Sequence, residues 1–340
     1  MSARGWRKIR VLAAMLLVTA AIGTTTGVAL AAFIGTTSNG GNSITASTDL
    51  TPPTVTATVV AKTTGYLSGY VNGGGSATYY VYANVTDIGT PATGVSSVMA
   101  DVRGLTTGGG AGSVALSSGS FSVGGVTYNY RSASQTANKN GLNDGSVVNY
   151  TVDATDANGN STNNSNNGSV TIDSAAPTAT DVQATNHTGG TAGKPEVTDK
   201  ITFTFSEEID PESILSGWTG ASTNVTVRIN DGGAGNDTLL VYNSANSAQL
   251  PLGSVNLGGT GYVTANAVFG SSGTRSTMVE SSSSPWTIII TLGQLNSGTA
   301  GTQSSNTTMT WTTNTADYDR AGNTLTTTSV TEGGSADKEF

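Results

Sequence analysis

The sequence predicts an all-β protein, with two tandem antiparallel β-sandwich domains after an N-terminal signal helix. Short alternating runs rich in Val, Thr, Tyr and Ile are separated by clusters of Gly, Asn, Asp and Ser, and this spacing is typical of sandwiches. After residue 31, no run of about 12 residues shows helical periodicity. Charged residues make up only 11% of the 340, whereas glycine occurs 45 times, which disfavours long charged helices.

Residues 1–31 have the three parts of a secretory signal peptide. An apolar run at 9–22 follows a basic start, and Ala29-Leu30-Ala31 offers a cleavage site of the small-x-small type. The basic residues are Arg4, Arg7, Lys8 and Arg10. We therefore expect a secreted protein, either extracellular or associated with the cell surface. The alternative is a transmembrane helix retained at 11–34, and contact with a membrane is expected only through such an uncleaved leader.

The next segment, 32–49, is expected to be extended. It begins with Ala32-Phe33, continues with Thr, Ser and Asn, and contains Gly41-Asn42-Ser43-Ile44-Thr45-Ala46. This pattern resembles the leader junction of biofilm-matrix and camelysin-like proteins that a SipW-type signal peptidase processes. The resemblance implies a matrix or surface protein, although the rest of the chain does not resemble those fibre subunits. Because residues 32–48 contain no proline, they are a candidate strand donor for self-assembly at an exposed sheet edge.

A weak internal repeat divides the remaining chain into two domains. Proline-containing junctions at 49–55 and 173–178 mark the two starts, because proline stiffens a short linker. An Asp-rich turn followed by a strand marks each end. The turns and strands lie at 153–160 and 169–173 in the first half, and at 317–323 and 328–332 in the second. We assign 50–174 to the first sandwich and 175–340 to the second.

Two runs show the clearest strand periodicity. Residues 79–86 and 201–205 place alternate residues on opposite faces, as half-buried antiparallel strands require. A single helical turn is expected just after the second run. There Asp210 can cap the turn, Pro211 can occupy its first position and Gly217 can end it.

The repeated motifs carry a second resemblance, which covers nearly the whole chain after the leader. Asp-x-(Thr/Ala)-x-Pro-Thr at each start and Asp-x-x-Gly-Asn at each end are similar to motifs of bacterial Ig-like domains. Residues 201–211, Ile-Thr-Phe-Thr-Phe-Ser-Glu-Glu-Ile-Asp-Pro, are similar to a signature of surface-layer Ig-like modules. The resemblance implies tandem Ig-like sandwiches on an exported protein of the actinobacterial cell-surface type. Many such proteins have no known activity.

Composition excludes several classes of function. There is no cysteine and only one histidine, so disulfides, thiolate zinc sites, cysteine nucleophiles and sites with two imidazoles are excluded. The net charge is −8, and the leader holds four of the 14 basic residues, so the remaining chain is more acidic still. An acidic surface repels phosphate backbones, so we expect no nucleic-acid partner. We also expect no catalytic residues and no organic cofactor.

The two domain-closing turns are the candidate metal sites. Their carboxylate and amide oxygens are ligands of the kind that calcium accepts. The candidate residues are Asp153, Asp156, Asn158, Asn160, Asp317, Asp319 and Asn323. The alternative is that Asp-x-x-Gly-Asn is an Asx-type turn, in which the side chains bind local backbone and no metal is needed.

Other motifs suggest sites but have simpler interpretations. Residues 231–240 match the calcium nonapeptide of RTX β-helices once, yet their glycines also suit a hairpin loop. One acidic patch has two interpretations, a glycosidase carboxylate pair or a solvated strand end. It consists of Glu207, Glu208, Asp210 and Glu212. His187 is either a general base or an exposed loop residue. Trp218, Trp286 and Trp311 are expected in a core or at its edge, with sugar stacking as the alternative.

The function that accounts best for these observations is non-catalytic. We expect a secreted cell-surface or extracellular-matrix protein, whose Ig-like modules act as spacer, adhesion or assembly elements. Its partners would be other surface or matrix proteins or cell-wall glycans. A cell-surface glycan-binding module is the first alternative and predicts aromatic residues in a line on one sheet face. A secreted hydrolase is the second and requires two converging carboxylates or a triad centred on histidine.

Overall fold

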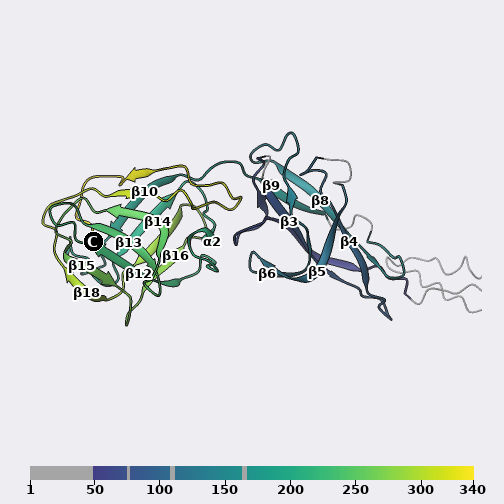
Figure 1. Ribbon diagram of the computed structural model, residues 1–340, viewed down its shortest axis with the longest axis horizontal. Coiled ribbons are helices and arrows are strands. Elements are labelled where there is room, and N and C mark those ends of the chain that lie inside the picture. The colour runs from purple at the N-terminus through teal and green to yellow at the C-terminus, as the bar shows by residue number, and fades with distance from the viewer. Residues whose placement is uncertain (1–48, 75–76, 108–111, 163–166) are drawn as a thin grey trace, which may run out of the picture.

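A computed structural model of the chain describes residues 49–74, 77–107, 112–162 and 167–340. It shows two β-sheet bodies joined end to end (Figure 1). The prediction of an all-β chain with two sandwich-like bodies is confirmed. The leader at 1–31 and the proposed strand donor at 32–48 lie outside the described residues. None of the described helices is long and apolar enough to cross a membrane.

The first domain is a sandwich built from one continuous, mostly antiparallel sheet that folds over itself. Its order is β1-β3-β6-β5-β4-β8-β9-β2, with β7 beside β3. The strands are β1 (Thr54–Lys62), β2 (Tyr70–Val71), β3 (Thr78–Thr86), β4 (Val95–Asp101), β5 (Val114–Val123), β6 (Val126–Ser132), β7 (Gln135–Thr136), β8 (Val147–Asp156) and β9 (Asn167–Ile172). The strand β2 pairs with β9 in parallel, whereas the other described pairs in this sheet are antiparallel.

Alternation along the strands builds the core of this domain. In β8, Tyr150, Val152 and Ala154 are buried and the residues between them are half-buried. They pack with Val60 and Val81 from the facing layer in one cluster. The same alternation carries Asp156 inward at the end of β8, where its side chain is 1% exposed. The strand therefore delivers a carboxylate to the buried end of the domain.

The second domain is built from a longer sheet. Its order is β10-β11-β17-β16-β12-β13-β14-β19-β20, and β15 pairs with β12 and β18. The strands are β10 (Ala179–Thr185), β11 (Lys200–Phe205), β12 (Thr223–Asn230), β13 (Thr238–Asn243), β14 (Gln249–Asn256), β15 (Val263–Phe269), β16 (Ser276–Glu280), β17 (Trp286–Thr291), β18 (Leu295–Ala300), β19 (Thr310–Thr312) and β20 (Ser329–Thr331).

The ends of this sheet approach each other, so the second body is barrel-like. The backbone N–H of Gly333, just after β20, donates to the Asp181 carboxylate on β10 at 2.8 Å. The Trp311 ring fills the centre and meets Phe203 and Phe205 edge to face, at centroid distances of 4.8 and 5.3 Å. Such contacts add to the free energy gained by burying the rings.

The sequence-based strand assignments agree with the structure. The runs at 79–86 and 201–205 lie in β3 and β11, and the closing strands lie in β9 and β20. The expected helical turn is α2 (Pro211–Ile214), with Asp210 as its N-cap. The predicted junction at 174/175 lies in the connection between β9 and β10.

The segment that matches the RTX nonapeptide is a hairpin loop between the antiparallel strands β12 and β13. The Asp231 carboxylate accepts the N–H of Gly233 at 2.7 Å, within the loop. Asp237 accepts the backbone N–H groups of Tyr262 and Val263 at 2.9 and 3.1 Å. Both aspartates therefore bind backbone groups, and the hairpin interpretation is confirmed.

Candidate functional site

The Asp-x-x-Gly-Asn turn that follows β8 is closed by its own side chains. The Asp156 carboxylate accepts the backbone N–H groups of Asn158 and Asn160 at 2.9 and 2.8 Å. The Asn160 amide also donates to Asp156 at 2.7 Å. Gly159 has φ of 88°, a left-handed conformation that glycine adopts at little cost. The turn is therefore an Asx-type motif.

The corresponding turn of the second domain repeats this geometry. Asp319 accepts the N–H groups of Ala321 and Asn323, both at 2.8 Å. The Asn323 amide donates back to Asp319 at 2.8 Å, and Gly322 has φ of 92°. The similarity of the two turns extends from sequence to individual hydrogen bonds.

Each turn also binds the backbone of the aspartate at the start of its own domain. Asn160 donates from its side chain to the Asp49 carbonyl at 3.1 Å, and Asn323 donates to the Asp173 carbonyl at 2.9 Å. Asp49 and Asp173 are the first residues of the two repeated junction motifs. We call each contact between a closing turn and a junction aspartate a clasp. The sequence predicted the two motifs separately but gave no sign that they touch.

Carboxylates gather at both clasps. Asp156 lies with Asp49 and Asp87, and each of the three offers a ligand atom within 4.8 Å of the others. Asp319 lies in an equivalent group with Asp173 and Glu207. Asp87 and Glu207 follow corresponding strands, β3 and β11, and neither was among the predicted metal ligands.

The other predicted calcium ligands lie outside these groups. The side-chain amides of Asn158, Asn160 and Asn323 donate to backbone carbonyls. Asp153 accepts the Thr162 hydroxyl at 3.4 Å. Asp317 is buried, and neither of its carboxylate oxygens has a hydrogen-bond partner among the described residues. Burial raises its pKa to about 8. The hydrogen bonds of the turn interpretation are thus present, and calcium at the clasps stays a prediction.

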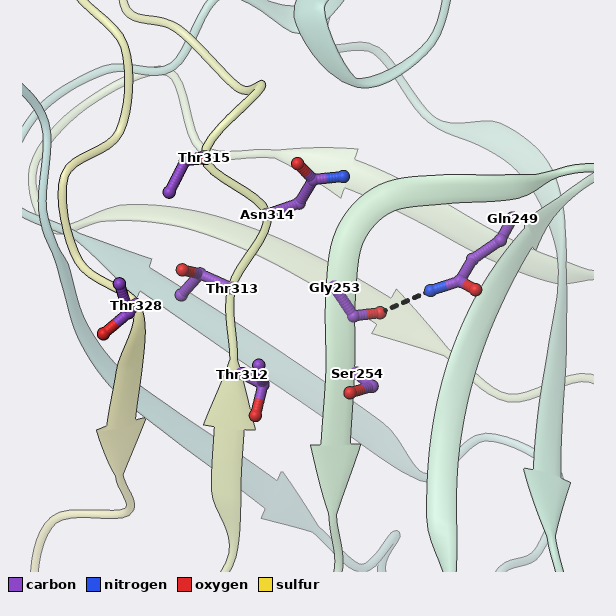
Figure 2. Close-up of a pocket in the computed structure, with 8 residues that line it drawn as sticks. All are labelled: Gln249, Gly253, Ser254, Thr312, Thr313, Asn314, Thr315 and Thr328. Carbon is purple, nitrogen blue, oxygen red and sulfur yellow. Dashed lines mark hydrogen bonds between the residues drawn. The ribbon is translucent and has the colours of Figure 1, made fainter.

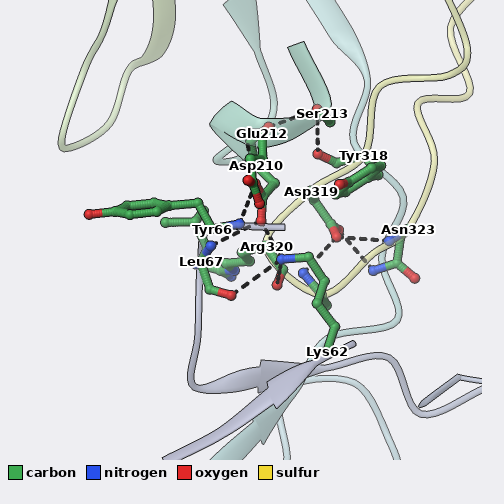
Figure 3. Close-up of polar contacts among 11 residues, drawn as sticks. Lys62, Tyr66, Leu67, Asp210, Glu212, Ser213, Tyr318, Asp319, Arg320 and Asn323 are labelled. Atoms are coloured by element: carbon green, nitrogen blue, oxygen red, sulfur yellow. Dashed lines mark hydrogen bonds and ion pairs between the residues drawn. The ribbon is translucent and has the colours of Figure 1, made fainter. Parts of the chain in front are cut away.

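A buried ion pair lies where the two domains meet (Figure 3). Lys62, at the end of β1, contacts Asp210 at the start of α2, and their side chains are 6% and 0% exposed. The Lys62 ammonium also donates to the Arg320 carbonyl at 2.8 Å. Asp210 in turn accepts the backbone N–H groups of Tyr66 and Leu67 at 2.9 and 3.0 Å. Such hydrogen bonds compensate charges that burial removes from water.

A second set of contacts joins the domains around Arg320. Its guanidinium donates to Asp173 at 2.9 Å and stacks on the Tyr70 ring of the first domain, 4.0 Å from the centroid. Beside it, the Asn72 amide of the first domain donates to Asn323. We call these contacts and the Lys62–Asp210 pair the joint. The joint therefore shares Asn323 and Asp173 with the clasp of the second domain.

The acidic patch predicted as a solvated strand end is instead part of the joint. Glu207 and Glu208 are half-buried, because the chain turns inward after β11 instead of continuing as an exposed strand. Burial, with help from Asp173 and Asp319, raises the pKa of Glu207 to about 7. Burial likewise raises the pKa of Glu208. The interpretation of this patch as solvated was wrong.

Glu280, at the end of β16, is another carboxyl group close to the joint. Burial raises its pKa to about 8, and the nearby charges of Glu208 and Asp210 add to the effect. Its backbone N–H donates to the Gly220 carbonyl at 2.9 Å, which keeps it beside α2. Burial therefore raises the pKa of each of the three glutamates beside the joint.

His187 does not lie free in its loop. Its Nδ1 is 2.7 Å from the Asp199 carboxylate, and the two side chains are 29% and 0% exposed. Asp199 also accepts the N–H groups of His187 and Glu196 at 2.9 and 2.7 Å. His187 therefore lies in a loop, as expected, but it is half-buried instead of exposed, because Asp199 closes the loop and holds the ring.

The tryptophans serve the core of the second domain, as predicted. Trp311 and Trp218 are 0% and 4% exposed, and Trp286 packs against the same core. A different aromatic group lies in the first domain, in a cluster separate from the main core, and two of its four rings are buried. It consists of Tyr80, Tyr82, Phe121 and Tyr128. The Arg131 guanidinium lies 4.3 Å from the ring centroids of both Tyr80 and Phe121.

A shallow hollow of about 400 Å³ lies beside β14 and β19 (Figure 2). Its lining residues are Gln249, Gly253, Ser254, Thr312, Thr313, Asn314, Thr315 and Thr328. Hydroxyl and amide groups therefore dominate its wall, and the Gln249 amide donates to the Gly253 carbonyl at 2.9 Å. The lining contains no carboxylate, so it offers hydrogen bonds but no acid–base pair.

Comparison with models of protein families, with curated proteins and with solved structures gave no match.

Proposed function

We propose that this chain is a secreted, non-catalytic protein of the cell surface or extracellular matrix, in which two Ig-like domains form a stiff spacer. The signal-like leader and the acidic, hydroxyl-rich composition support export and an extracellular role. The single observation that carries the spacer role is the joint. Adhesion or assembly partners, whether surface proteins or cell-wall glycans, would bind at the ends or faces of this spacer.

The joint supports stiffness because its Lys62–Asp210 ion pair is buried and its contacts come from both domains. Removing one partner of a buried ion pair leaves an uncompensated charge and costs about 3–5 kcal/mol. Lys62 and Asp210 therefore disfavour any motion that separates them. Arg320 adds a second point of attachment through Asp173 and Tyr70, and two separate points restrict both bending and rotation.

Spin-label distances across the joint test this proposal. The chain has no cysteine, so the exposed Val126 and Val197 can be replaced by cysteines that carry one label in each domain. We expect a single narrow distance distribution for the otherwise unchanged chain and a broad one for Lys62→Met. Arg103→Ala, which removes an exposed ion pair with Asp101, should leave the distribution narrow. A broad distribution in the unchanged chain would contradict the spacer proposal.

Glycan binding is the second candidate function, and the aromatic cluster of the first domain favours it. Tyr80 and Phe121 are half-buried in a cluster separate from the main core, and the Arg131 guanidinium lies against both rings. Aromatic rings stack on the apolar faces of sugars, and a guanidinium can donate hydrogen bonds to hydroxyls. The proposed ligand is a cell-wall polysaccharide.

A pull-down with purified cell walls tests this candidate. We expect the unchanged chain to bind the walls and the double variant Tyr80→Ala, Phe121→Ala to lose binding. Thr313→Ala in the hydroxyl-lined hollow is the matched control and should bind normally. Equal binding by all three proteins would rule out the aromatic cluster as the glycan site.

A further inference from the structure

A third group of carboxylates lies in the second domain, away from both clasps. It consists of Glu332, Asp337 and Glu339, which offer ligand atoms within 4.8 Å of one another. Glu332 and Glu339 are 8% and 0% exposed, whereas Asp337 is exposed. Two of the acids are therefore removed from water, and the third faces it.

Backbone contacts hold the three residues in place. Glu332 and Met309 exchange two bonds, since the Glu332 N–H donates to the Met309 carbonyl and the Met309 N–H donates to the Glu332 carboxylate, both at 3.0 Å. Asp337 pairs with Thr307 through two backbone hydrogen bonds of 2.6 and 3.1 Å. The Glu339 N–H lies 3.3 Å from the Tyr262 hydroxyl. The arrangement is therefore fixed by neighbouring strands and does not depend on contacts between the acids.

Glu339 lacks the partners that a buried carboxylate needs. Neither of its oxygens accepts a hydrogen bond from any described residue. Within the described part of the chain, no lysine or arginine forms an ion pair with any of the three acids. A buried charge of this kind is costly unless something of opposite charge joins it.

We propose that Glu332, Asp337 and Glu339 form a binding site for a hard divalent cation, and that calcium is the ion it takes. Three carboxylates offer oxygens alone, which suits calcium better than the softer metals that prefer sulfur or imidazole. The exposed Asp337 gives the ion a route from solvent. None of the three residues belongs to the predicted calcium ligands, and the site does not depend on the proposed spacer function.

The alternative is that Glu332 and Glu339 share a proton and that no cation binds. The two cases predict different responses to calcium. A cation requires deprotonated carboxylates, so its binding releases protons and becomes tighter as the pH rises. A ligand that binds only the folded state also raises the melting temperature by mass action. A shared proton produces neither response to calcium.

Calorimetric titration of the full chain with calcium chloride, and melting curves with calcium or a chelator, test the proposal. We expect calcium to raise the melting temperature of the unchanged chain. Glu339→Gln should bind one calcium ion fewer than the unchanged chain. Calcium should therefore raise the melting temperature of this variant by less. Because Glu339→Gln removes an unpaired buried acid, its melting temperature in chelator should be no lower than that of the unchanged chain.

Two further variants guard against a loss of folding. Asp337→Asn alters an exposed side chain and should weaken calcium binding at this site by about tenfold or more, because affinity follows the charge of the ligands. Asp101→Asn makes the same charge change at the surface of the first domain and should bind calcium normally. Equal numbers of sites and equal temperature increases in the unchanged chain and Glu339→Gln would overturn the proposal. Normal affinity in Asp337→Asn would also overturn it.

Discussion

Asn323 is the residue with the most varied contacts at the joint. Its amide donates to Asp319 and to the Asp173 carbonyl, and its oxygen accepts from Asn72 of the first domain. One side chain thus closes a turn, holds the start of its own domain and contacts the neighbouring domain. Its counterpart Asn160 makes the first two kinds of bond.

We expect Asn323→Ala to destabilise the second domain by about 1–3 kcal/mol, since it leaves buried acceptors without donors. Asn224→Ala, on an exposed position of β12, should change the free energy of unfolding by less than about 0.5 kcal/mol. Urea unfolding monitored by tryptophan fluorescence measures both. Equal values for the two variants would contradict a structural role for the Asn323 amide.

Glu280 should make stability depend on pH. Its folded pKa of about 8 lies above the value of about 4.3 for an unfolded glutamate. Between these values the unfolded chain has lost the proton that the folded chain keeps, so stability falls as the pH rises, by at most about 1.4 kcal/mol per unit. Glu280→Gln has no carboxyl group at this position, so its stability does not fall for this reason as the pH rises. Its stability relative to the unchanged chain should therefore increase from pH 5 to pH 8, and a constant difference would contradict the assignment.

At the scale of elements, the domain-closing turn depends on a left-handed glycine. Gly159 has φ of 88°, and an added Cβ would meet no atom within 4 Å, so substitution there tests the backbone alone. We expect Gly159→Ala to cost about 1–2 kcal/mol. The control is Gly235→Ala in the β12–β13 loop, where φ is not positive. Thermal unfolding of both variants measures the difference, and a smaller cost at Gly159 would contradict the prediction.

Local periodicity was sufficient to predict the main elements. Alternation in 79–86 and 201–205 identified β3 and β11, and an Asp-Pro pair identified the single turn of α2. The Asp-x-x-Gly-Asn motifs predicted their own hydrogen bonds because those bonds span only a few residues. These features depend on neighbours in sequence, so the sequence alone was enough.

Contacts between distant segments were beyond prediction. Asn323 and Asp173 are 150 residues apart, and Lys62 and Asp210 are 148 apart. Nothing local in a strand end or a loop shows which other segment of the chain will cover it. For this reason Glu207 and Glu208 were interpreted as solvated, and the partner of His187 was missed. The carboxylates that join Asp156 and Asp319 were missed for the same reason.

At the scale of the whole molecule, the signal-like leader predicts the residue at which the mature chain begins. We expect the exported protein to begin at Ala32, after cleavage that follows Ala31. Intact-mass analysis of protein from the culture medium and the cell surface measures this. A membrane-bound product that still carries 1–31 would instead support the retained helix.

Self-assembly through 32–48 is a further prediction for the whole chain. Among the described strands, β1 pairs only with β3. Its other edge is already occupied at Val60, whose carbonyl accepts the N–H of Gly69 at 2.8 Å, so the part of this edge before Val60 is the candidate acceptor for a donated strand. If assembly occurs this way, light scattering should show polymers of the chain beginning at Ala32 and monomers of the chain beginning at Asp49. Polymers of equal size from both would contradict strand donation.

The clasps also determine how a mechanical load would travel through the protein. A pull on the linker between the domains would reach Asp173, and from there Arg320 and Asn323, before it reached the first strand of the second domain. The tension would pass into the last turn of that domain without first peeling β10 from the sheet. Each domain thus has a clasp between its entry and its closing turn. Under extension, each clasp would have to break before its domain could unfold from that end.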